Sequence, residues 1–204
     1  MSPSTLPAGL RHWTAVHPNI DWTVSSYALV PEGVLLNPLL PDGDHSVLDG
    51  VDLQAIVLTN RHHTRDSDAL AGEAGVTVLA PRVGLDDLAG FTAPVEGYVD
   101  GDELPGGQRA IEVGVISPDE FAVHAPQYRA LAVADGVMRE GDGDLLAMPD
   151  SLLGDDPDAV RRGLGERFAQ LCDEIEFDHL LLAHGLPVIG DGREALAAFA
   201  ASIR

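Results

Sequence analysis

One stretch in the first half of the chain most constrains how it can fold. Residues 55–59 form a short, continuous apolar run, which is typical of a strand buried on both faces of a sheet. A helix is predicted over residues 67–74, because polar residues that can cap a first turn precede it and a glycine follows it. Residues 76–80 are apolar again and predict a second buried strand. A strand, a loop, a helix and a strand in this order favour an α/β architecture.

The rest of the chain is expected to form mostly short elements, because 22 glycines and 14 prolines interrupt it. A strand hairpin is predicted over residues 23–30 and 34–37. The later elements are predicted as strands over residues 109–113, 120–124, 131–134 and 177–183, and as helices over residues 156–174 and 193–203. No stretch has the composition of a linker, so we expect one domain over residues 1–204.

Three of the predicted buried strands end beside residues that can bind a metal ion. These residues are His62, His63, Asp66, Asp135 and His184. In open α/β sheets ligands bind beyond the carboxyl ends of strands, so these residues are expected to converge if their strands share a sheet edge. Imidazole nitrogens and carboxylate oxygens together suit Zn, Mn or Fe(II). Taken singly, each residue could equally serve a turn, a cap or a solvated loop. The coincidence at three strand ends is what favours a metal site.

The charge of the chain excludes some classes of partner. There are 33 acidic residues against 12 basic ones, all of them Arg, which gives a net charge of −21. A surface this acidic repels phosphate backbones and anionic lipids, so we expect a small-molecule ligand and neither a nucleic acid nor a membrane. Residues 1–7 lack the basic start and apolar run of a signal peptide, and the single Cys172 cannot form an internal disulfide. These features predict a cytoplasmic protein.

The order of these motifs resembles the metallo-β-lactamase fold, in its glyoxalase-II-like hydrolase branch. In that family a strand ending in Thr leads to a His-x-His-x-Asp-His loop, an Asp ends a later strand, and a last His precedes Gly. Thr59 and the loop after it, Asp135 and His184 match these positions, while Asn37 stands where the family has an acid. The similarity extends from about residue 24 to residue 193. It implies a four-layer αββα sandwich and a metal-dependent hydrolase.

The central loop departs from the family's motif, and two registers fit it. The preferred register places His62 at the first His position and Asp66 at the Asp position. The alternative register starts at Asn60 and puts Thr64 and Arg65 where the Asp and the last His belong. In the preferred register Thr64 and Ser67 replace two of the family's histidines, and Ile116 falls near the position of a further one.

The resemblance then implies at most one metal ion. One of the family's two sites retains only His62 and Asp135, whereas the other retains Asp66, Asp135 and His184. Three ligands are enough for one Zn, Fe or Mn ion with open positions. Asp66 would also orient the attacking hydroxide, and His62 or His63 would carry a proton or act as a substitute ligand. We therefore predict slow hydrolysis of a small ester, thioester or lactone. The alternative is a metal-free, non-catalytic binding or scaffold protein that descends from the same fold.

Overall fold

The computed structural model describes residues 5–204, so residues 1–4 of the segment tested above for a signal peptide lie outside the described part. Two six-stranded sheets account for most of the strands. The first has, in spatial order, β1 (Leu10–Val16), β2 (Thr23–Leu29), β3 (Val34–Leu36), β4 (Ala55–Val57), β5 (Thr77–Pro81) and β6 (Val95–Tyr98). The second has β14 (Val188–Ile189), β13 (His179–Leu182), β10 (Ala130–Val133), β9 (Phe121–Ala125), β8 (Gln108–Glu112) and β7 (Glu103–Leu104). A separate hairpin pairs β11 (Met138–Arg139) with β12 (Leu145–Leu146).

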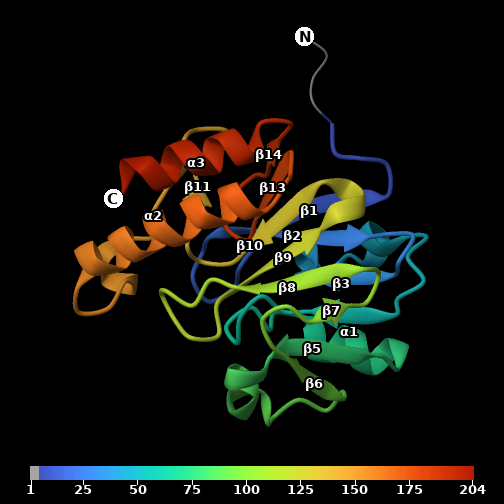
Figure 1. Cartoon of the computed structure of the whole chain (residues 1–204). Helices are drawn as coiled ribbons and strands as arrows, with labels where there is room; N and C mark the ends of the chain where they lie inside the picture. The colour runs from blue at the N-terminus through green and yellow to red at the C-terminus, as the bar shows by residue number, and fades with distance from the viewer. Residues whose placement is uncertain (1–4) are drawn as a thin grey trace.

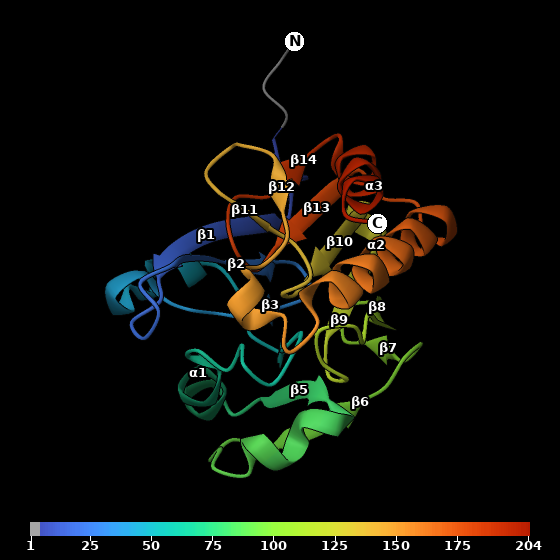
Figure 2. The same cartoon turned by 90° about the vertical axis from the view of Figure 1, so that its left-hand side faces the viewer.

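Helices cover the outer face of each sheet. The α-helices are α1 (Ser67–Ala74), α2 (Pro157–Glu174) and α3 (Gly192–Ser202). Helices α2 and α3 lie side by side against the second sheet, and α1 lies on the opposite side of the molecule against the first sheet (Figures 1 and 2). Short 3₁₀ turns are η1 (Pro41–Gly43), η2 (His45–Leu48), η3 (Arg82–Leu88), η4 (Pro126–Tyr128) and η5 (Asp150–Leu152). The predicted four-layer α/β arrangement is confirmed. Among residues 5–204, no helix combines the length and the apolar composition that a membrane crossing requires.

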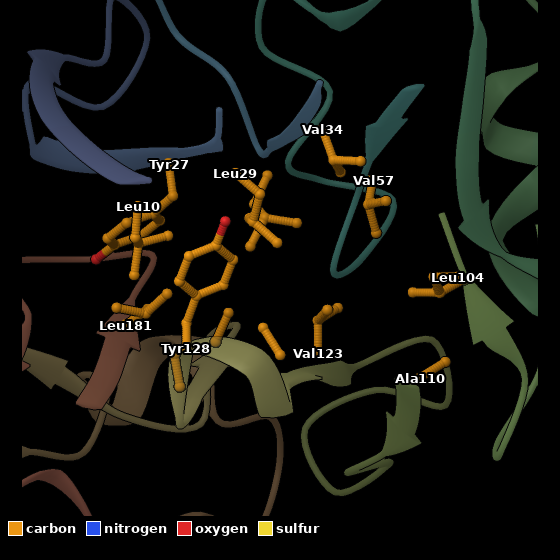
Figure 3. Packing of buried hydrophobic residues seen from close by; sticks show 14 of the residues in the cluster. Leu10, Tyr27, Leu29, Val34, Val57, Leu104, Ala110, Val123, Tyr128 and Leu181 are labelled. Carbon is orange, nitrogen blue, oxygen red and sulfur yellow. The ribbon is translucent and has the colours of Figure 1, made fainter. Parts of the chain in front are cut away.

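The main core lies between the two sheets. Leu29, Val34 and Val57 of the first sheet face Val123 and Leu181 of the second (Figure 3). Because successive side chains of a strand point to opposite faces, the residues between them reach the outer layer. Ala28, Leu35 and Ile56 accordingly pack with Leu70 and Ala71 of α1. Strands β3, β4 and β10 are buried on both faces, which explains why their apolar runs in the sequence are continuous rather than alternating.

Most predicted elements are present, and the longest strand that was not predicted is β1. Helix α1 has the predicted bounds, and Gly75 ends it in the left-handed conformation (φ 68°). Helix α2 begins after Asp156, whose side chain accepts a hydrogen bond from Ala159 N. Strand β1 was not predicted, because Arg11 and His12 interrupt its apolar pattern. It forms as an edge strand that pairs with β2 over seven residue pairs. This pairing is a tertiary contact, which no local sequence pattern predicts.

The carboxyl ends of strands from both sheets meet at one edge of the sandwich. Backbone hydrogen bonds connect the sheets there, from Ser25 N to Ala183 O (3.0 Å) and from Phe121 N to Thr59 O (2.9 Å). Residues that follow β4, β10 and β13 are therefore brought to a common place. The expectation that these strand ends converge is met, although they belong to two sheets rather than one.

Candidate functional site

Three side chains meet where the strand ends converge. His63 follows β4, Asp135 follows β10 and His184 follows β13. The Nε2 atoms of His63 and His184 lie 3.0 Å and 2.9 Å from the same oxygen, Asp135 Oδ1. The three donor atoms lie within 4.8 Å of one another, which is the spacing of groups that can share one metal ion. The set consists of two imidazoles and one carboxylate, which matches the three protein ligands of many catalytic zinc sites.

Asn60 fixes the other oxygen of the carboxylate. Its Nδ2 donates to Asp135 Oδ2 (2.7 Å), while its Oδ1 accepts from the backbone N–H groups of His62 and His63 (3.0 Å each). Two backbone donors on one atom settle the orientation of the amide. Asn60 therefore folds the loop after β4 and leaves one carboxylate oxygen, Oδ1, facing the two imidazoles.

A buried chain of polar groups supports His63 from behind. Asn37 accepts a hydrogen bond from Thr59 N (2.9 Å) and donates one from Nδ2 to Thr59 Oγ1 (2.8 Å). Thr59 Oγ1 lies 3.0 Å from His63 Nδ1. This hydroxyl can donate to or accept from the ring, so it is compatible with the Nδ1–H tautomer that leaves Nε2 free for a metal. His184 differs, because its buried Nδ1 has no partner among the described residues.

Arg65 supplies a partly buried positive charge beside the three residues. Its guanidinium donates to the backbone oxygens of Ser25 (2.7 Å), Asn37 (2.7 Å) and Ala183 (3.2 Å), and thereby joins both sheets. Its backbone has a φ of 42°, a strained conformation for a residue that is not glycine. Burial lowers the pKa of Arg65 to about 10, a shift that Asp135 opposes, so the group remains a cation at neutral pH.

The protonation states favour metal binding. Burial lowers the pKa of His63 to about 4 despite the opposing influence of Asp135, so the ring is neutral at pH 7. Burial alone would raise the pKa of Asp135, but the interactions with His63 and His184 outweigh it and hold this pKa well below its usual range. Neutral imidazole and ionised carboxylate are the metal-binding forms, so an ion need not displace a proton from these two groups at neutral pH. The donor set therefore fits one divalent ion.

A second buried acid lies beside the loop that carries Asp135. Glu120 accepts a hydrogen bond from Ile116 N (3.3 Å), and its Oε1 has no partner among the described residues. Burial and the nearby Asp135 raise the pKa of Glu120 to about 8, so this carboxyl is largely protonated at neutral pH. Because Glu120 is largely protonated, it adds no second negative charge beside Asp135.

The structure distributes the sequence-predicted residues differently from the preferred register. Asp135 and His184 are brought together, and His63 joins them where His62 was expected. His62 is exposed, because Asn60 holds the backbone of residues 62 and 63 and only the second ring turns inward. Asp66 lies outside the group; its Oδ2 accepts from Leu40 N (2.6 Å) instead.

The alternative register describes the loop better at two positions. It places Asn60 and Arg65 at ligand positions, and both side chains do lie at the site. The end of strand β4 and Thr59 could have favoured this register, because they fix where the loop begins. The sequence does not predict the left-handed backbone conformation at Arg65. The side chain of Arg65 lies at the site, whereas that of Asp66 bonds to Leu40 N.

A cavity of about 540 Å³ opens beside the three residues. Its polar lining includes His62, His63, Asp135 and His184 together with Arg61 and Arg65. Its apolar lining consists of Ile20, Trp22, Ile116, Met148 and Leu152. Its volume lies in the ~300–1,000 Å³ range of sites for small molecules.

Comparisons with known proteins agree with this architecture. Among solved structures, the DIM-1 metallo-β-lactamase is similar with a TM-score of 0.72 at 15% identity, over 98% of this chain and 97% of that one. A metallo-β-lactamase from Pontibacter korlensis gives 0.67 at 16% identity, over 97% of each chain. The flavodiiron protein from Giardia intestinalis gives 0.68 at 14% identity, and 98% of this chain corresponds to 58% of that one.

At such identities these likenesses concern the fold alone. No curated protein matches the sequence significantly. A family model described as the metallo-β-lactamase superfamily matches residues 6–203, which is nearly the whole sequence. This chain therefore belongs to the metallo-β-lactamase superfamily.

Proposed function

We propose that this protein is a hydrolase that uses one divalent metal ion, held by His63, Asp135 and His184. The observation that carries the proposal is the convergence of three donor atoms at the wall of a cavity, with His63 neutral and Asp135 ionised at neutral pH. Such an ion lowers the pKa of bound water and polarises a carbonyl group. Asp66 is not included in this ligand set, because its carboxylate is bound to Leu40 N.

The residues around the ion would have separate tasks. Asn60 holds the carboxylate of Asp135 in place. His62 lines the cavity, is exposed, and can accept or deliver a proton there. Arg65 provides a fixed positive charge next to the reacting group. A small ester, thioester or lactone is the proposed substrate; this substrate class and the glyoxalase-II-like branch rest on the motif resemblance.

Metal content tests the ligand set directly. Protein purified after expression in metal-replete medium is expected to carry about one equivalent of Zn, Mn or Fe, measured by elemental analysis. Asp135→Asn and His184→Ala should lose it. His45→Ala, a change at an exposed histidine in η2, should retain it. Full retention of the metal by Asp135→Asn and His184→Ala would show that the ion binds elsewhere.

A metal-free binding protein is the second candidate, and Arg65 is the observation that favours it. A guanidinium beside Asp135 already balances the carboxylate and repels a second cation. The two candidates differ in their response to a strong chelator. Loss of a bound ion would lower the melting temperature by mass action, whereas a metal-free protein would melt unchanged.

The proposed ligand is a small molecule rather than a nucleic acid or a membrane. The net charge of −21 supports this choice. A cytoplasmic location is proposed because the single Cys172 is buried and has no partner for an internal disulfide. Salt-sensitive binding of RNA or of anionic vesicles would contradict the first statement.

A further inference from the structure

A second cavity lies directly beside the candidate site. It has a volume of about 610 Å³ and shares two lining residues, Trp22 and His184, with the cavity described above. The Trp22 ring meets the His184 ring edge to face, with the centroids 5.8 Å apart. The two cavities are thus neighbouring compartments with one aromatic side chain and one candidate ligand at their common border.

The second cavity is firmly attached to His184. The hairpin formed by β11 and β12 builds part of its wall, and Arg139 N donates to His184 O (3.0 Å). Gly185 has a φ of +98°, and a Cβ there would lie 1.9 Å from Arg139 O. The β11–β12 hairpin is therefore in backbone contact with the segment that carries His184, so the second cavity and the candidate site share structural elements.

The lining of this cavity selects against anions. Its apolar members are Trp22, Met138, Leu146, Ala147, Pro149 and Leu186. Leu146 and Leu186 keep 42% and 40% of their surface exposed, so a ligand in the cavity can contact both side chains. Asp21 and Glu140 add negative charge. Arg139, the one arginine of this lining, is bound through its guanidinium to the carbonyl oxygens of residues 142, 143 and 187.

We propose that this second cavity is a subsite for an uncharged apolar group of the ligand, such as an aryl or alkyl chain. The reacting bond would then lie at the border formed by Trp22 and His184, with the remainder of the molecule in the first cavity. Calling the ligand a substrate rests on the proposed function, whereas binding of the apolar group does not.

Fluorescence of Trp22 tests the proposal without activity and without metal. The other tryptophan, Trp13, is buried, bonded to Leu39 O, and lines neither cavity. Chelator-treated protein is titrated with 3-phenylpropan-1-ol and, separately, with 3-phenylpropionate. The alcohol should change the Trp22 emission, and the carboxylate should bind at least about tenfold more weakly because of the acidic lining.

Two matched variants locate the binding. Leu146→Glu places a charge in the second cavity, whereas Leu152→Glu places one in the first; both leucines are partly exposed, so both variants should fold. Leu146→Glu should weaken binding of the alcohol by at least about tenfold, and Leu152→Glu by less than about twofold. Unchanged binding in Leu146→Glu, a larger effect of Leu152→Glu, or tighter binding of the carboxylate would overturn the proposal. Because the protein is metal-free throughout, loss of the hydrolase proposal would leave these results unaffected.

Discussion

Substitution of Arg65 by Met tests how the site is held together. Arg65 donates three hydrogen bonds to backbone oxygens that lie at strand ends of both sheets. Methionine is unbranched and of comparable length, so it can occupy much of the same space while removing the charge and every donor. The variant therefore removes the connection between the sheets and leaves the packing largely in place.

The expected loss of stability follows from opposing contributions. Hydrogen bonds from a charged donor are worth about 1.5–3 kcal/mol each. Two of the three acceptors keep another partner, since Asn37 O also accepts from Ser26 Oγ and Ala183 O from Ser25 N. Removing the guanidinium also removes its desolvation penalty, which stabilises the folded state by several kcal/mol. We expect the free energy of unfolding to fall by about 2–4 kcal/mol.

Urea unfolding followed by circular dichroism measures this difference. A loss of that size should lower the midpoint by roughly 1 M, since a slope of about 2–3 kcal/mol/M suits a chain of this length. Arg65→Lys should be intermediate, because one ammonium group cannot reach all three oxygens in the geometry of the guanidinium fork. Arg82→Met is the control, because Arg82 is exposed and makes a single bond of 3.5 Å. Wild-type stability in Arg65→Met would refute the idea that this side chain ties the strand ends together.

In chelator-treated protein, stability should fall as the pH drops from about 6.5 towards 4, because the pKa of His63 is about 4 in the folded state and the unfolded chain takes up the proton first. The acid loss should be smaller in His63→Gln by up to about 3 kcal/mol, and equal pH profiles would contradict the assigned burial. The opposite sign applies to Glu120: its pKa of about 8 means that stability is lost as the pH rises through 8, so Glu120→Gln should exceed the wild type at pH 9 by roughly 2–4 kcal/mol and match it near pH 5. Gly185→Ala should destabilise the fold by more than about 3 kcal/mol and reduce metal content, whereas Gly50→Ala, with a φ of +77° but open space around it, should cost about 1–2 kcal/mol; equal thermal shifts would exclude the predicted clash.

The secondary structure could be predicted where its signal is local. Helix α1 follows from its flanking residues, and the buried strands β4, β10 and β13 follow from short apolar runs. Strand β1 could not be predicted, because Arg11 and His12 interrupt its apolar pattern and its pairing with β2 is a tertiary contact. Of the predicted metal ligands, Asp135 and His184 meet at the strand ends, whereas His62 and Asp66 do not join them.

The site itself could be predicted only in part. Asp135 and His184 come directly after buried strands, and their positions are fixed by the sheet. The loop after β4 is different, because six polar residues stand in a row from Asn60 to Arg65 and each could face inward. Asn60 determines which side chains face inward, because it binds Asp135 and the backbone N–H groups of His62 and His63. The bond to Asp135 joins residues 75 positions apart, and no spacing within the loop encodes it, whereas the two backbone bonds are local.

The amino-acid sequence alone determined the α/β class, the order of the main buried strands and α-helices, the family resemblance and the net negative charge, because these depend on composition and on local patterns of apolar residues. Only the tertiary structure decided that His63 rather than His62 faces Asp135, that Asp66 binds Leu40 N, and that Arg65 sits among three strand ends. The physical reason is that a side chain in an irregular loop takes its direction from backbone torsions and from hydrogen bonds to distant segments, and these exist only once the two sheets have packed.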